Sequence, residues 1–156
     1  MTNASVPAVR TPLLALLEDD SPFSIDEVPP PAFTLAQLRA SVRAELTRLF
    51  NTRRRPEHAR RRLDVLQYGL PDWSVRYAAR ADDRVTLERD MTAAIIAFEP
   101  RLVRPRVEVE PDADTPWRLR VRITGLLRAE GTNSPVVYAA ELADGLPIGV
   151  VDESFP

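Results

Sequence analysis

The chain has no cysteine and a single histidine, His58, among its 156 residues. The lack of cysteine excludes disulfide bonds and thiolate metal ligands, and it suits a reducing cytoplasm. One histidine leaves no zinc site of the ordinary type and no well-placed base for a serine or cysteine triad. The five glycines are scattered and form no phosphate-binding loop. We therefore expect no metal, no cofactor and no catalytic residue.

Long apolar runs are also missing. No stretch approaches the roughly 18 apolar residues that a membrane-spanning helix needs. The short run over residues 13–17 is followed by no signal-peptide cleavage pattern. The formal net charge is −2, so bulk charge favours neither nucleic acid nor a membrane surface. We expect no membrane insertion.

Lysine is absent, so all 21 basic residues are arginine. Arginine forms bidentate pairs that suit protein interfaces, although codon bias explains the same composition more simply. Residues 53–62 hold six arginines and one glutamate. No aromatic side chain for base stacking lies among them, which favours a solvated or protein-facing cluster over a nucleic-acid site.

The N-terminal part differs in composition from the rest. Thr11-Pro12 has the form of a helix start, and it is followed by the apolar residues Leu13, Leu14, Leu16 and Leu17. A helix of two turns is too short to be stable alone, and the triple proline at 29–31 forms a stiff tether. We expect residues 1–32 to be a docking segment, 33–151 a single domain and 152–156 a tail.

Two amphipathic helices are predicted within the domain. The first begins at a capping box, Thr34 to Gln37, and continues to Asn51. The second is capped by Asp82 or Asp83 and ends with Glu99 as its last residue, because proline follows. Their apolar stripes are Leu35, Leu38, Val42, Leu46 and Leu49 in the first helix, and Leu87, Met91, Ile95 and Phe98 in the second.

Alternating apolar and charged residues then predict strands over 103–109, 117–123 and 136–142, with a short edge strand at 148–151. Gly125 is expected to mark a β-bulge, because two leucines after it break the alternation. Helices followed by strands indicate an α+β fold, with the N-terminal helices on one face of a small, mainly antiparallel sheet.

Glu99-Pro100-Arg101 lies at the junction between the second helix and the first strand. A carboxylate at a helix C-terminus is disfavoured by the helix dipole, so Glu99 is expected to have a partner. Arg101 is the nearest candidate, since residues i and i+2 of an extended segment point the same way. The pair could be an internal salt bridge, a contact for another protein, or both.

Phe98-Glu99-Pro100-Arg101-Leu102 resembles the Glu-Pro-Arg signature of the lysozyme-like baseplate wedge family of contractile phages and type VI secretion systems. Residues 41–54 and 65–72 resemble the TssE baseplate subunits of the secretion branch. The resemblance covers about Leu35 to Leu142 and is loose before and after it. It implies the lysozyme-like wedge fold and a structural, non-enzymatic role.

The resemblance also implies partners and sites. The partners would be other baseplate wedge subunits, contractile sheath subunits and, as a further candidate, the spike hub, at the cytoplasmic side of the inner membrane. Glu99, Pro100 and Arg101 would contact the sheath, and an open strand edge would accept sheath strands by β-augmentation. The residues expected to dock on wedge proteins are Leu13, Leu14, Leu16 and Leu17. Candidates for a further interface are Arg53, Arg54, Tyr68, Asp72 and Trp73.

Two alternative functions belong to other classes. An anti-adaptor of the same fold would regulate protein turnover, but the segments around Asn51 and Tyr68 favour the baseplate subunit. A peptidoglycan hydrolase would need a carboxylic acid with a raised pKa. Glu18-Asp19-Asp20 lies outside the predicted domain, and a pairing of Glu99 with Arg101 would lower the pKa of that carboxyl.

Overall fold

The computed structural model describes residues 34–54, 67–73, 80–115, 117–129 and 132–154. The predicted docking helix with Leu13, Leu14, Leu16 and Leu17 lies outside the described residues. So do the domain boundary near residue 32 and the part of the arginine cluster from residue 55 onward.

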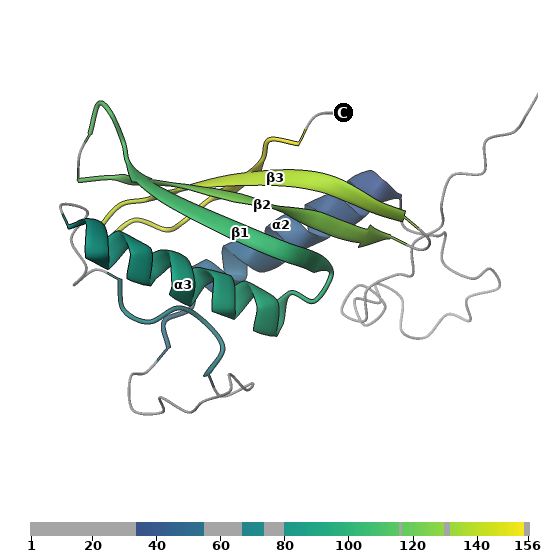
Figure 1. The fold of residues 1–156 in the computed structure, drawn as a ribbon, viewed down its shortest axis with the longest axis horizontal. Coiled ribbons are helices and arrows are strands. Elements are labelled where there is room, and N and C mark those ends of the chain that lie inside the picture. Colours follow the sequence, from purple (N-terminus) through teal and green to yellow (C-terminus); the bar gives the residue numbers. More distant parts are fainter. Residues whose placement is uncertain (1–33, 55–66, 74–79, 116, 130–131, 155–156) are drawn as a thin grey trace, which may run out of the picture.

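In the part of the chain that the structure describes, two helices precede a four-stranded antiparallel sheet, which confirms the predicted α+β fold (Figure 1). The strands follow one another in the order β1-β2-β3-β4. The elements are α2 (Leu35–Asn51), α3 (Ala81–Phe98), β1 (Leu102–Pro111), β2 (Leu119–Ala129), β3 (Thr132–Leu142) and β4 (Val150–Asp152). Within the described residues, no helix is long and apolar enough to cross a membrane.

The core lies between the helices and one face of the sheet. Val107, Ile123 and Tyr138 are neighbours across β1, β2 and β3, and all three are buried. The residues directly before and after each of them along its own strand are partly or fully exposed. Alternation of this kind means that one face of the sheet is covered, and the other face is left open to solvent.

Helix α2 has the predicted capping box. The Gln37 backbone N–H donates to the Thr34 hydroxyl (3.2 Å), and the Thr34 N–H donates to the Gln37 side-chain oxygen (2.8 Å). At the other end, the Asn51 amide donates to the Ile148 carbonyl (2.7 Å) and accepts from the Ile148 N–H (2.8 Å). The helix therefore also anchors the segment that leads into β4. The buried face of α2 consists of Leu38, Val42, Leu46, Leu49 and Phe50.

The predicted cap of α3 is wrong. The helix begins at Ala81 after Arg80, and no side chain caps it. Asp82 and Asp83 lie inside the first turn, where carboxylates interact favourably with the helix dipole without acting as caps. The far end also differs by one residue, because Glu99 has φ −125° and ψ 72° and lies just beyond the helix. The following proline disfavours the α conformation at that position.

The strands lie close to their predicted positions, with two differences. Trp117 was expected in the second strand, but it precedes β2 and is 73% exposed. The last strand begins at Val150 rather than Ile148. Ile148 is buried, and its backbone bonds to Asn51 instead of to β3.

The β-bulge is in β1 and not at Gly125. Strand β2 pairs with β3 without interruption through Gly125, whereas β1 has an extra residue between Val103 and Arg106, directly opposite the glycine. Arg104 has a positive φ of 53° at this point. A Cβ atom on Gly125 would lie 2.8 Å from the Leu102 side chain. The glycine therefore leaves room for the Leu102 side chain of the bulged strand.

Candidate functional site

Two of the three motif segments lie side by side after α2. The Leu70 N–H donates to the Thr52 carbonyl (2.9 Å), and the Arg54 N–H donates to the Leu70 carbonyl (2.7 Å). Gly69 has a φ of 110°, and a Cβ atom there would be only 2.3 Å from the Thr52 oxygen. Only glycine fits this approach of two backbones, which explains its place in the motif.

The further interface candidates are mostly engaged within the domain. Arg53 pairs with Asp72 at 3.0 Å, and both side chains are about half exposed. A surface pair of this kind contributes roughly 0–1 kcal/mol. The Tyr68 ring contacts the Phe98 ring edge-on, with centroids 5.2 Å apart. Trp73 packs against the core. Both aromatic residues therefore support the domain itself.

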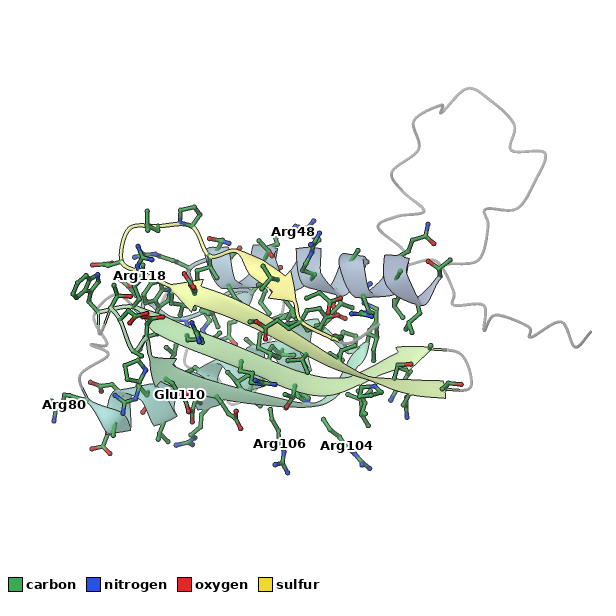
Figure 2. All side chains as sticks on the ribbon, turned by 90° about the horizontal axis from the view of Figure 1, so that it is seen from above. Arg48, Arg80, Arg104, Arg106, Glu110 and Arg118 are labelled. Carbon is green, nitrogen blue, oxygen red and sulfur yellow. The ribbon has the colours of Figure 1, made fainter. Side chains whose placement is uncertain are left out.

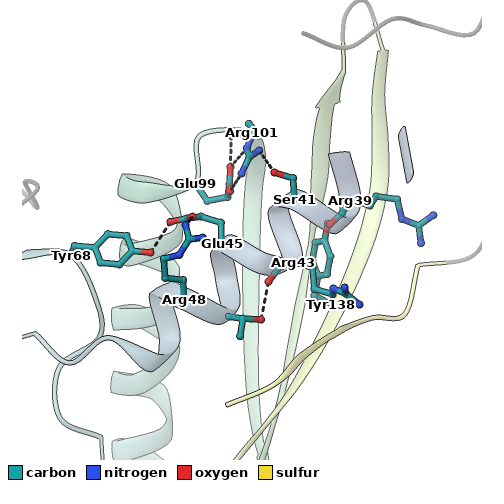
Figure 3. Close-up of polar contacts among 10 residues, drawn as sticks. Arg39, Ser41, Arg43, Glu45, Arg48, Tyr68, Glu99, Arg101 and Tyr138 are labelled. Atoms are coloured by element: carbon teal, nitrogen blue, oxygen red, sulfur yellow. Dashed lines mark hydrogen bonds and ion pairs between the residues drawn. The ribbon is translucent and has the colours of Figure 1, made fainter. Parts of the chain in front are cut away.

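Glu99 and Arg101 form the internal salt bridge that the sequence suggested (Figure 3). The Arg101 Nε donates to Glu99 Oε1 at 2.7 Å, its Nη2 donates to Glu99 Oε2, and its backbone N–H also reaches Oε1 (3.2 Å). The residues meet through a tight turn, closed by the Leu102 N–H on the Glu99 carbonyl (3.1 Å), and not along an extended segment. The turn brings the two side chains together before the strand begins.

Burial divides this pair unequally. The Glu99 side chain is 1% exposed, whereas the Arg101 side chain is 26% exposed. Burial alone lowers the pKa of Arg101, but the hydrogen bond and charge of Glu99 outweigh it, and the pKa is raised. The guanidinium is therefore charged at every physiological pH, and it is the part of the pair that a partner can reach.

Two neighbouring elements hold the turn in place. Arg101 Nη1 donates to the Ser41 hydroxyl of α2 at 2.9 Å. The Arg101 carbonyl accepts from the Arg128 N–H of β2 at 2.9 Å. Ser41 was not singled out as a site residue from the sequence. Its spacing of four residues from Glu45 places both on one face of α2 and could have indicated it.

Glu45 joins the second motif to the same helix. It accepts from the Tyr68 hydroxyl at 2.6 Å and from Arg48. Burial, followed by the contact with Glu45, raises the pKa of Tyr68. A line of polar contacts thus runs from the Tyr68 loop along α2 to the α3–β1 turn (Figure 3). We call it the polar seam, and it consists of Ser41, Glu45, Arg48, Tyr68, Glu99 and Arg101.

The polar seam lacks the features of a hydrolase site. Both carboxylate oxygens of Glu99 accept hydrogen bonds from Arg101, so this group is not placed to donate a proton to a sugar. Among the described residues, no three His, Cys, Asp or Glu side chains gather as a metal site would require. The buried carboxylate and the hydrogen bonds around it instead hold the Arg101 guanidinium in a partly exposed position at the α3–β1 corner.

Comparison with known protein families gives a match that includes the Glu99–Arg101 corner. The family model of baseplate wedge protein gp25 matches residues 36–132, from α2 to the start of β3. The match includes every residue of the polar seam, and this family also contains the TssE subunits. A comparison with curated proteins found no significant match. The family is structural rather than catalytic, which fits the chemistry of the seam. Since the match spans more than half of the chain and its three motifs are joined in space, the protein belongs to the baseplate wedge protein gp25 family.

Proposed function

We propose that the protein is a structural subunit of a type VI secretion baseplate, which links wedge proteins to the contractile sheath and helps to start sheath polymerisation. The observation that carries the proposal is the Glu99–Arg101 pair, held at the turn between α3 and β1. The turn is preorganised, so a partner that binds there orders little further structure.

The partner would meet Pro100 and Arg101 rather than Glu99. Pro100 is exposed and Arg101 is partly exposed, whereas the Glu99 carboxylate is covered. Glu99 would act indirectly, by orienting the guanidinium and holding its charge. An acidic group of the sheath subunit would complete the contact, because a desolvated charge pair at an interface favours one partner over others.

The edge strand β1 is poorly suited to accept a sheath strand. The Val109 N–H, which points away from β2, already donates to Glu88 Oε1 of α3 at 2.9 Å. Pro105 and Pro111 on the same strand have no N–H to offer. N–H groups alternate in direction along the strand, so between the two prolines Val107 is the other residue whose N–H points away from β2. Such an edge resists the addition of another strand.

The edge of β4 is the better candidate for β-augmentation. The Glu153 N–H donates to the Val137 carbonyl of β3 (2.8 Å), so the N–H groups of Val150 and Asp152 point outward. Sheath strands that add here would extend the sheet beyond β4. The corner at Arg101 would then set which sheath subunit docks.

Further contacts remain part of the proposal. Leu13, Leu14, Leu16 and Leu17 would dock on wedge proteins, and the spike hub is a further candidate partner. Arg53 and Asp72 would add a minor polar contact. Assembly would take place at the cytoplasmic side of the inner membrane.

The test neutralises the corner without leaving a buried charge. The double variant Glu99→Gln with Arg101→Gln removes both charges and keeps a polar side chain at each position. We expect it to fold and to join the baseplate but to support few sheaths, as seen by fluorescence imaging of labelled sheath subunits in cells. The control, Arg89→Gln with Asp82→Asn, removes one charge of each sign at exposed positions of α3 outside the proposed contacts and should leave sheath assembly intact.

Normal sheath numbers in cells carrying the folded corner variant would reject the proposal. The alternatives predict different results. An anti-adaptor would leave sheaths unaffected and would change the turnover of a client protein, and a hydrolase would clear peptidoglycan in a zymogram.

A further inference from the structure

The sheet face opposite the helices is open and basic along its second strand. Arg118 lies just before β2, and Arg120 and Arg122 follow it at every second position. All three side chains are exposed. Arg118 is labelled near one end of the sheet in Figure 2. This face lies away from the polar seam, on the other side of the sheet.

A groove of about 550 Å³ runs beside this row of arginines. The small residues Ala139, Ala143 and Gly149 leave room for it, and Leu146, Pro147 and Val151 form an apolar part of its wall. Leu146 is 57% exposed and Val151 is 53% exposed. The groove therefore combines cations with apolar surface that nothing within the described residues covers.

The arginines of the groove are weakly held by their own domain. Arg118 is 4.0 Å from Glu141, and Arg120 is 3.5 Å from Asp112. Both arginines are exposed, so these pairs contribute little. Arg122 lies opposite Glu108 in the β1–β2 register, yet no ion pair joins them within the described residues, and Arg122 lines the groove instead. These guanidinium groups can therefore exchange their present contacts for a ligand at low cost.

The spacing of the arginines indicates the shape of that ligand. Alternate residues of a strand are about 6.6–6.8 Å apart. An extended peptide with carboxylates at alternate positions has the same repeat, so its acids would face Arg118, Arg120 and Arg122 in register. An apolar residue at its end would contact the wall formed by Leu146, Pro147 and Val151.

We propose that this groove binds an extended acidic segment of a partner protein, by alternating carboxylates on the arginine row and an apolar contact at its rim. The inference is independent of the sheath contact at Arg101. Nucleic acid fits less well, because Glu141 and Glu153 also line the groove and would repel a continuous phosphate backbone. No aromatic side chain among the lining residues offers a stacking surface.

Fluorescence anisotropy with the full chain tests the proposal. The probe is a fluorescein-labelled peptide that alternates glutamate with threonine and ends in leucine, compared with a peptide of the same composition whose glutamates are contiguous. We expect the alternating peptide to bind more tightly, with an affinity that falls as salt rises. Arg122→Glu should weaken binding roughly tenfold or more, because reversing one charge replaces an attraction with a repulsion.

Two further variants distinguish a groove from general attraction. Arg43→Glu makes the same charge change at an exposed position of α2, on the covered side of the sheet, and should leave binding within about twofold. Ala139→Leu fills the groove without changing charge and should also weaken binding. Circular dichroism confirms the fold of each variant.

Three results would overturn the proposal. The first is that both peptides bind equally well or that neither binds. The second is that Arg43→Glu weakens peptide binding as much as Arg122→Glu does. The third is that a single-stranded oligonucleotide binds more tightly than the peptide at physiological salt. The last result would assign the arginine row to nucleic acid instead.

Discussion

Arg39 of α2 and Asp152 of β4 are joined by two hydrogen bonds, of 2.7 and 3.0 Å, across 113 positions of sequence. Arg39 also donates to the Ser154 carbonyl at 2.8 Å. These bonds hold β4 against α2. Burial alone raises the pKa of Asp152, but the bonds from Arg39 and Ser154 outweigh it and lower the pKa to about 2.

This pair predicts an acid-sensitive contribution to stability. A carboxyl whose pKa is lower in the folded state stabilises the fold above its unfolded pKa, near 4, and loses that contribution as the pH falls toward 2. With allowance for partial exposure, we expect about 1–2 kcal/mol. Urea unfolding between pH 2 and pH 7 should show this loss in the native protein and a smaller one in Asp152→Asn. An equal pH dependence in both proteins would contradict the assignment.

Gly69 predicts a large and local cost of substitution. Gly69→Ala should destabilise the domain by about 3 kcal/mol or more, because an alanine at φ 110° would also drive its Cβ into the Thr52 carbonyl. Gly145 also has a positive φ, of 72°, but a Cβ there meets nothing within 4 Å. Gly145→Ala should therefore cost only about 1 kcal/mol. Thermal or urea unfolding of the two variants compares them directly, and equal losses would mean that the backbone contact is unimportant.

The Glu99–Arg101 pair predicts unequal effects of its two single substitutions. Arg101→Ala leaves a buried carboxylate without its partner and should cost about 3–5 kcal/mol. Glu99→Ala leaves a cation that is partly exposed to water, so its cost should be smaller. A double-mutant cycle measured by urea unfolding gives the coupling between them. The reverse order of the two costs would show that Glu99 is more solvated than its position implies.

Proline substitutions in the two edge strands are expected to differ in their effect on sheath assembly. Val150→Pro removes an outward N–H of β4, and Val107→Pro removes one from β1, while neither should remove a bond to the neighbouring strand. If sheath strands add to β4, only Val150→Pro should reduce sheath assembly in cells. The two valines are similarly buried, at 6% and 8% exposed, so each serves as the stability control for the other. Loss of sheaths in Val107→Pro alone would move the docking edge to β1.

Much of the secondary structure could be predicted because its signals are local. The capping box at Thr34 depends on residues three positions apart, and the alternation in β2 depends on residues two positions apart. Where a signal depended on a distant neighbour, the prediction failed. Gly125 was expected to mark a bulge, and the bulge lies opposite it, but the sequence does not show that the extra residue belongs to β1.

The candidate site divides in the same way. The sequence alone determined that Glu99 and Arg101 are close, since one proline separates them. Only the tertiary structure decided that Glu99 is buried, that Ser41 holds Arg101 and that Glu45 receives the Tyr68 hydroxyl. Short-range geometry limits which neighbours along the chain can pair. Burial and partners from other elements arise only when helices and strands pack, because they depend on contacts between residues far apart in sequence.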